Sequence, residues 1–333
     1  MNKKTLWDRL TDWNRSPVLR GIDGLRVKWY VHQLKDKEGN VRYRAAWALG
    51  EIGDARAVPA LIDALKDNEW YVRKGAAEAL GKIRVNEEQL KEITRMLEEG
   101  KTWEERNGAA IALGKIGDAR AVPVLIDTLK NKDWFVRYRA AKALGKIGVN
   151  EEQLKEITRM LEEGKTWEER NGAAMALGEI GFDKIPIESK VLVLLILEGM
   201  DEVVAIGKPA VPALIDTLKD QYVRYRAAIV LGEIAEKTAD KGDHISALKI
   251  IKDSTAAIMR YYEEKCRRAE REERRSLLKE RGKMLEPLSM VTDKIARTQL
   301  PNPLNEKEPM KWKLPKTTDS ECKQEKRRTI KNK

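Results

Sequence analysis

The sequence contains two Gly-Lys-Thr tripeptides, Gly100–Thr102 and Gly164–Thr166. Such tripeptides occur in loops that bind the phosphates of nucleotides. Such a loop follows a strand and needs another glycine five residues before the second one. Arg95 and Arg159 occupy that earlier position here, and no strand pattern precedes either tripeptide. Each glycine instead fits a helix end, followed by a threonine and a glutamate that cap the next helix. We therefore predict no nucleotide site.

Side chains that catalyse reactions or bind metals are sparse. The two histidines, His32 and His244, lie far apart in the sequence, and neither is followed by glutamate. Cys266 and Cys322 both lie in the polar C-terminal part, and they provide neither a disulfide framework nor a thiolate metal site. We therefore predict no catalytic residues, no metal and no cofactor, and a protein that is not an enzyme.

Composition and charge indicate a globular protein with a basic C-terminal part. The sequence is 42% hydrophobic and 36% charged, and its net charge is +11. Residues 260–333 carry 22 Lys and Arg against 13 Asp and Glu, which is +9 of the total charge of +11. The rest of the chain is therefore nearly neutral. Neither a signal peptide nor an apolar run of membrane-spanning length is present, which predicts a cytoplasmic protein without a membrane partner.

An exact internal repeat determines the expected organisation. The 26 residues from Val85 to Ala110 recur without change from Val149 to Ala174, 64 residues later. An Ala-Leu-Gly motif recurs at spacings of 31 and 33 residues, ending at Gly50, Gly81, Gly114, Gly145 and Gly178. The repeat is therefore about 32 residues long, and two unlike units form the 64-residue pair. Periods of this length are typical of stacked repeat arrays.

Each unit is predicted to contain two helices. Residues 41–53 have small and apolar residues at three-to-four spacing and end in Gly53, which favours a helix stop. Residues 56–67 have an apolar stripe, with Pro59 in the first turn. In the alternate unit the second helix starts at Asn86, which forms a predicted capping box with Gln89. One helix pair cannot bury both of its faces, so each pair must stack on its neighbours.

The segment VRYRAAWALGEIGDARAVPALIDALKD resembles the HEAT-like repeat of the phycobilin (PBS) lyase family, of the archaeal and bacterial type. The resemblance covers roughly residues 20–235 and implies an all-α fold, a right-handed α-solenoid of stacked helix pairs. Bilin-lyase activity and the iron chemistry of the HEAT-like hydroxylases would rest on the resemblance alone. No residue of this sequence supports either activity.

The repeat boundaries predict four segments. Residues 1–40 form an N-terminal helical cap whose Trp7, Trp13 and Trp29 cover the first open face. Residues 41–235 form the solenoid, with an extra-helix insertion at about 182–207 and a sixth unit that closes the stack. The next 63 residues, 236–298, form a long charged helical segment, read as one helix from His244 that projects into water. The basic tail, residues 299–333, is predicted to be disordered.

An arginine recurs near the start of every predicted first helix. These residues are Arg42, Arg73, Arg106, Arg137, Arg170 and Arg224. We interpret them as a structural ladder that joins adjacent units through the Asp54 or Asp118 loops, because bidentate arginine pairing suits such joints.

Trp and Tyr also recur on the first helices, interleaved with basic and polar residues. By the resemblance, these positions form a ridge on the concave surface, and Trp, Tyr and Arg dominate binding hot spots. The candidate partner-binding residues are Tyr43, Arg44, Trp47, Trp70, Tyr71, Lys74, Asn107, Trp134, Tyr138, Arg139, Lys142, Asn171, Tyr225 and Arg226. The alternative is that the aromatic residues are packing wedges between repeats, which we favour for Trp103 and Trp167.

Together these patterns predict a non-enzymatic scaffold that binds a protein or peptide on the concave ridge. The alternative is a nucleic-acid-binding protein that uses its basic C-terminal region. An enzyme of the bilin-lyase or hydroxylase type is the second alternative. Phosphate contacts weaken steeply with salt, whereas an aromatic protein interface does not, so salt dependence separates the first two.

Overall fold

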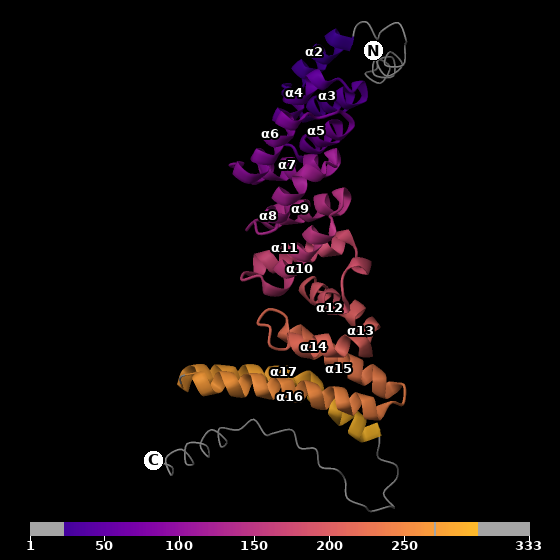
Figure 1. Cartoon of the computed structure of the whole chain (residues 1–333), viewed down its shortest axis with the longest axis vertical. Helices are drawn as coiled ribbons and strands as arrows, with labels where there is room; N and C mark the ends of the chain where they lie inside the picture. The colour runs from indigo at the N-terminus through magenta and orange to yellow at the C-terminus, as the bar shows by residue number, and fades with distance from the viewer. Residues whose placement is uncertain (1–22, 270, 299–333) are drawn as a thin grey trace, which may run out of the picture. The chain divides into compact units, whose positions relative to one another are not determined.

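In the computed structural model, which describes residues 23–269 and 271–298, every regular element is helical (Figure 1). The all-helical prediction is therefore confirmed for this part of the chain. The chain divides into two compact units, Met1–Ile185 and Pro186–Lys333.

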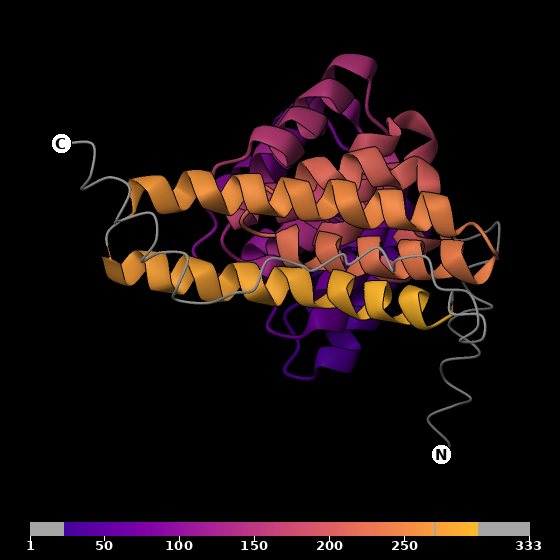
Figure 2. The ribbon, with the colours of Figure 1, turned by 90° about the horizontal axis from the view of Figure 1, so that it is seen from below.

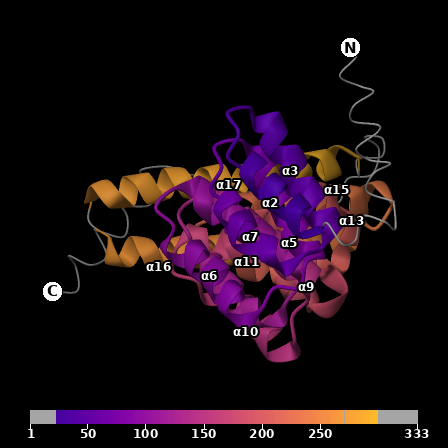
Figure 3. The same ribbon diagram turned by 90° about the horizontal axis from the view of Figure 1, so that it is seen from above.

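The first unit is a stack of helix pairs. In each pair a first helix packs on the first helix of the next pair, and a second helix flanks it. The first helices are α3 (Gly39–Ile52), α5 (Trp70–Lys82), α7 (Trp103–Ile116), α9 (Trp134–Ile147) and α11 (Trp167–Ile180). The second helices are α4 (Val58–Ala64), α6 (Glu87–Glu99), α8 (Val122–Thr128) and α10 (Glu151–Glu163). Figure 3 shows α6 and α10 to one side of α5 and α9.

The ends of these helices follow the predicted signals. Asn86 and Gln89 form a capping box at the start of α6, and the Thr102 side chain accepts a hydrogen bond from the Glu105 backbone N–H at the start of α7. Gly53 ends α3 with a φ of 71°, a left-handed conformation that glycine adopts at little cost. Short 3₁₀ turns η2 (Ala55–Ala57) and η3 (Ala119–Ala121) lead into α4 and α8. The local sequence therefore determines most helix boundaries.

The glycine of the Ala-Leu-Gly motif lies where adjacent first helices approach most closely. A Cβ atom added to Gly50 would lie 2.8 Å from the Cα atom of Ala79, and one added to Gly114 would lie 2.9 Å from the Cα atom of Ala143. A Cβ atom added to Gly81 would lie 2.7 Å from the backbone oxygen of Lys115. The motif recurs because a larger residue would separate the stacked helices.

The described part of the N-terminal segment is the helix α2 (Asp23–Gln33), together with the turn that leads into α3. Val27, Tyr30 and Leu34 are buried, whereas Trp29 is 49% exposed. The expected covering role of Trp29 is therefore wrong, because aliphatic and tyrosine side chains on the other side of this helix fill the contact. Trp7 and Trp13 lie outside the described residues.

The second unit begins with the residues of the predicted insertion. It contains α12 (Ile187–Ile196), α13 (Met200–Ile206), α14 (Val211–Thr217), α15 (Arg224–Asp240), α16 (His244–Arg268) and α17 (Arg271–Thr298), with the 3₁₀ turn η5 (Lys208–Ala210) before α14. The 3₁₀ turn η4 (Phe182–Lys184) lies at the end of the first unit. The α15 helix carries the sixth repeat and is covered by both α16 and α17. The expectation that this unit is the last of the stack stays a prediction, and the helices that follow it pack on it.

The residues expected to form one projecting helix instead form two helices that lie side by side. Figure 2 shows α16 and α17 next to each other, and both contact α15. The helix breaks at Ala269, whose backbone is extended. Tyr262 is fully buried and donates a hydrogen bond to the sulfur of Met284 at 3.2 Å. On α16, Ile245 is 85% exposed, whereas Ala247 and Ile250 are buried.

Deleting one 64-residue pair, Asn86 through Val149, should leave a shorter folded stack. The deletion joins Val85 to Asn150, which carries the same capping box as Asn86. Because each repeat contacts its neighbours, the remaining pairs keep equivalent partners. We expect cooperative thermal unfolding in far-UV circular dichroism.

The control deletion removes Asn86–Lys101, which contains α6 alone. It leaves two adjacent first helices without the second helix that flanks them, so its unfolding should broaden. Equal loss of cooperativity in both deletions would contradict the repeat organisation.

Candidate functional site

Along each first helix of the first unit, side chains four residues apart form a column. Residues four apart lie on the same helix face. On α9 this column is Trp134, Tyr138, Lys142 and Lys146. The equivalent columns are Trp70, Lys74, Glu78 and Lys82 on α5; Trp103, Asn107, Ile111 and Lys115 on α7; and Trp167, Asn171, Met175 and Glu179 on α11. We call these columns together the first-helix face.

Aromatic side chains are concentrated where α7 and α9 begin. The rings of Trp134 and Tyr138 stack with centroids 5.2 Å apart and planes 3° apart. Phe135 contacts both Trp134 and Trp103, at centroid distances of 5.1 and 6.1 Å. Trp103, Trp134 and Phe135 are 41, 47 and 55% exposed. These four residues form what we call the aromatic cluster: a partly exposed apolar surface that the fold does not cover.

A second aromatic group lies on α3 and α5. Tyr43 contacts the Tyr71 ring, and Tyr71 contacts Trp70, at centroid distances of 6.2 and 5.9 Å. A Cβ atom added to Gly75 would lie 2.8 Å from the Tyr43 ring, so Tyr43 packs on the next helix although it is 37% exposed. Trp47 is 44% exposed. Tyr43 thus has a packing contact, whereas much of Trp47 faces solvent.

Positive charge collects at the other end of the α9 column. Lys142 Nζ lies 5.3 Å from the Tyr138 ring centroid and 3.4 Å from a carboxylate oxygen of Glu179. Partial desolvation lowers the pKa of the exposed Lys146, the positive charges of Lys115, Lys142 and Arg139 lower it further, and the Glu179 carboxylate raises it. These four cations therefore lie close enough to repel one another.

The structure places the predicted partner-binding residues in three different environments. Arg44, Trp47, Trp70, Lys74 and Trp134 are exposed, while Tyr71, Tyr138, Arg139 and Lys142 are partly exposed. Asn107 and Asn171 are only 5 and 7% exposed, so their predicted contact with a partner does not fit the structure. Tyr225 and Arg226 belong to the second unit, where Arg226 donates to the Leu195 backbone oxygen at 2.9 Å and pairs with Glu198.

The recurring arginines bind their own loops. Arg73 donates to the backbone oxygens of Asp67 and Asn68 at 2.6 and 2.9 Å, and Arg137 does the same in its loop. Their predicted pairing with Asp54 or Asp118 is wrong. Those carboxylates bind Arg56 and Arg120, two residues further along the chain.

The other four arginines of the predicted ladder also have partners within the structure. Arg42 forms a bidentate pair with Asp67, in the loop before the next first helix, with distances of 2.5 and 2.8 Å. Arg106 donates to the Gly100 backbone oxygen, and Arg170 donates to the Leu161 backbone oxygen. Arg224, in the second unit, donates to the Tyr261 hydroxyl at 2.9 Å. A side chain committed in this way has little capacity left for a partner.

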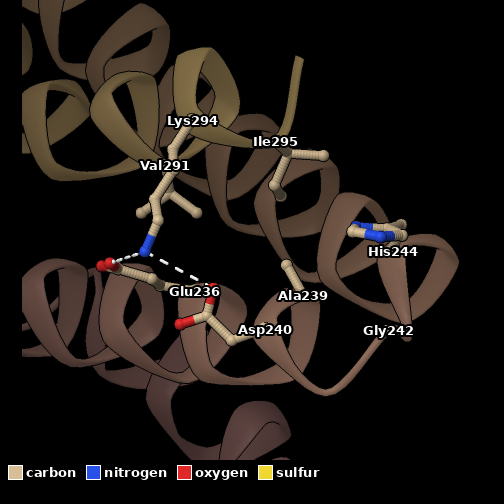
Figure 4. Close-up of a pocket in the computed structure, with 8 residues that line it drawn as sticks. All are labelled: Glu236, Ala239, Asp240, Gly242, His244, Val291, Lys294 and Ile295. Carbon is tan, nitrogen blue, oxygen red and sulfur yellow. Dashed lines mark hydrogen bonds and ion pairs between the residues drawn. The ribbon is translucent and has the colours of Figure 1, made fainter. Parts of the chain in front are cut away.

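The second unit contains a cavity of about 270 Å³ between the end of α15, the start of α16 and the last turns of α17 (Figure 4). Lys294 lies at one side and pairs with Glu236 and Asp240, at 2.5 and 3.4 Å. The hydrogen bond to Glu236 raises the pKa of Lys294. The Lys294 ammonium group of this cavity is therefore already paired with both of its carboxylates.

Within residues 23–269 and 271–298, no group of three His, Cys, Asp or Glu side chains is arranged to hold a metal ion. No helix among these residues is both long and apolar enough to cross a membrane.

Sequence reasoning missed three contributors to the first-helix face. Phe135, which joins Trp103 to Trp134, is absent from the predicted binding residues. Lys115 and Lys146 are also absent from that prediction, which is based on aromatic residues and their sequence neighbours. Lys115 lies three four-residue steps after Trp103, and Lys146 lies three such steps after Trp134. This spacing places each lysine on the same helix face as the tryptophan and was the sequence signal for it.

Comparison with known proteins supports the repeat assignment. The family model of HEAT repeats matches residues 27–113 and 90–178. No curated protein matches the sequence.

Several solved structures resemble the chain at low identity. The CpcE–CpcF complex of phycocyanin lyase from Nostoc sp. PCC7120 is 20% identical, with 79% of this chain and 94% of that chain covered and a TM-score of 0.33. Kap95p, in a structure with RanGDP, is 14% identical, with 84 and 39% covered and a TM-score of 0.37. Human deoxyhypusine hydroxylase is 21% identical, with 82 and 92% covered and a TM-score of 0.23. Scores this low carry no information on function.

Proposed function

Because residues 27–178 of this chain are HEAT repeats, we propose that the protein is a non-enzymatic scaffold that binds a protein or peptide on the first-helix face. The observation that carries the proposal is the aromatic cluster. Trp103, Trp134 and Phe135 remain 41 to 55% exposed although Phe135 contacts both tryptophans. Exposed aromatic groups of this kind mark interaction sites more often than scattered single residues do.

The residue types of the aromatic cluster suit binding. Trp and Tyr supply large contact areas and lose little side-chain entropy on binding, because each has only two side-chain torsions. Tyr138 also has Arg139 and Lys142 beside its ring, with distances of 5.6 and 5.3 Å to the centroid. Apolar area therefore lies next to hydrogen-bond donors, which is the composition of an interface hot spot.

A photo-cross-linking amino acid at position 135 identifies the partner in the native host. Benzoylphenylalanine replaces Phe135, which is 55% exposed, with little change in packing. The control site is Lys91, whose side chain is 75% exposed on α6. We expect one protein to cross-link at position 135 and not at position 91.

The double variant Trp134→Ala, Phe135→Ala then tests the cluster with the purified partner. Truncating a hot spot costs about 2 kcal/mol or more, so we expect the Kd to rise about 30-fold or more. The melting temperature should change little, because both side chains are about half exposed. Titration calorimetry and circular dichroism provide the two measurements.

The matched control is Leu25→Ala, Trp29→Ala, which removes two exposed apolar side chains from α2. These residues are 67 and 49% exposed, comparable with the test pair, and we expect an unchanged Kd. An equal loss of affinity in both double variants, or in neither, would contradict binding at the aromatic cluster.

A further inference from the structure

The α9 column combines an apolar end and a cationic end on one helix, and this arrangement restricts what it can bind. Trp134 and Tyr138 form a stacked pair at the N-terminal end, and Lys142 and Lys146 follow at four-residue intervals. From Trp134 to Lys146 the helix rises about 18 Å, at about 1.5 Å per residue. An extended peptide spans that distance with about five or six residues.

The cationic end has more positive charge than its neighbours neutralise. Lys115 pairs with Glu78 at 3.2 Å and Lys142 with Glu179 at 3.4 Å. Lys146 is exposed and has no ion pair within the described part of the chain, and the buried Nε atom of Arg139 lacks a hydrogen-bond partner there. An anion placed beside Lys146 and Arg139 would relieve the repulsion among the four cations.

The positions of the acidic side chains favour the carboxylates of a peptide over the phosphates of a nucleic acid as the bound anion. The last positions of the four columns, together with the equivalent Glu51 on α3, form a row across the helices: Glu51, Lys82, Lys115, Lys146 and Glu179. Within this row Glu51 pairs with Lys82. Glutamates thus occupy both ends of a row of three lysines. A nucleic-acid backbone places phosphates at regular short intervals and would meet these glutamates as it continued. A short acidic peptide segment fits between them.

We propose that the α9 column binds a partner segment in which acidic residues follow or precede a bulky apolar anchor at a separation of about five residues. The anchor packs on Trp134, Phe135 and Tyr138, and the carboxylates lie beside Lys142, Lys146 and Arg139. This inference rests on the proposed function, because it names the chemistry of the partner at the same face.

The test uses the full chain and fluorescein-labelled synthetic peptides in an anisotropy titration. The first peptide carries Trp-Leu and Glu-Glu-Asp separated by a four-residue Gly-Ser spacer. The second peptide replaces the three acids with lysines, and the third places the acids directly beside the anchor. We expect the first peptide to bind most tightly, the third at least about fivefold more weakly, and the second undetectably.

Charge reversal locates the site. Lys142→Glu, Lys146→Glu should weaken binding of the first peptide at least about tenfold, because attraction becomes repulsion at two positions. The matched control, Lys91→Glu, Lys155→Glu, makes the same change in net charge on α6 and α10, where both side chains are exposed. We expect less than a twofold change in its Kd.

Three results would overturn the inference. The first is no binding of the first peptide by the wild-type chain, and the second is equal weakening by the two charge reversals. The third is tighter, competitive binding of a dT20 oligonucleotide, which would indicate a nucleic-acid face. A partner cross-linked at position 135 that lacks an acidic segment would refute only this inference. Failure to cross-link any protein there would refute the proposed function itself.

Discussion

Gly172→Ala should lower the stability of the first unit by about 3 kcal/mol, although alanine is the better helix former. An added Cβ atom would lie 2.1 Å from the backbone oxygen of Leu129 and 2.9 Å from its carbonyl carbon. The obstacle is backbone at the end of α8, so no side-chain rotation can remove the clash. The α11 helix must move away from α8, and the contacts between them loosen. We expect the thermal midpoint to fall by about 10 °C.

Gly108 occupies the equivalent position on α7, where an added Cβ atom would lie 2.2 Å from the Leu65 backbone oxygen. Gly108→Ala should therefore have an effect of the same size. The control is Gly282→Ala on α17, where an added Cβ atom has nothing within 4 Å. That change should stabilise its helix by up to about 1 kcal/mol. Similar midpoints for the Gly172 and Gly282 variants would show that α8 and α11 do not approach this closely.

Arg137→Ala should cost about 3 kcal/mol, the second large effect on stability. Arg137 is 4% exposed and donates to the backbone oxygens of Asn131 and Lys132 at 2.7 and 3.0 Å. It also donates to the side-chain oxygen of Asn171 on the next first helix, at 3.2 Å. Removing the guanidinium leaves the buried Asn171 oxygen and the two part-buried backbone oxygens without this donor, and a buried acceptor left unsatisfied costs about 1 to 3 kcal/mol.

Arg120→Ala is the control for Arg137→Ala. The Arg120 side chain is 55% exposed and pairs with Asp118 at 2.6 Å within its own loop. Exposed pairs contribute about 1 kcal/mol or less, so the urea midpoint should hardly change. A small effect at Arg137, equal to that at Arg120, would mean that water satisfies the loop carbonyls when the arginine is absent.

Local sequence signals predicted the helices well because capping and periodicity act over a few residues. The box formed by Asn86 and Gln89, the stop at Gly53 and the stripe of α4 all appear as expected. The Ala-Leu-Gly motif gave the repeat length, and the structure adds its cause, a close approach between first helices at Gly50 and Gly81.

Long-range partners could not be predicted in the same way. Asp54 seemed available to the recurring arginines, but Arg56 lies two residues away and binds it first. Asn107 and Asn171 looked like surface residues because they are polar, yet both are buried. Asn171 accepts a hydrogen bond from the Arg137 guanidinium, a pairing across two helices that residue types alone do not reveal.

The break between α16 and α17 shows the same limit. The segment around it consists of good helix formers, so its helical pattern continues without a stop signal. Tertiary packing decides the outcome instead, because Tyr262 and Met284 can both be buried only if the chain turns back.

The two identical second helices, α6 and α10, could exchange places during folding. The α6 and α10 helices share their sequence and capping boxes, so either could in principle pack against α7 or α11. Connection length is one feature that distinguishes them. A native α6–α7 contact closes a loop of a few residues, whereas the exchanged contact must close about 64 residues at an extra cost of about 2.4 kcal/mol. This entropic difference corresponds to a preference of about 60-fold, so the order along the chain helps to protect the duplicated array from slipping by one pair.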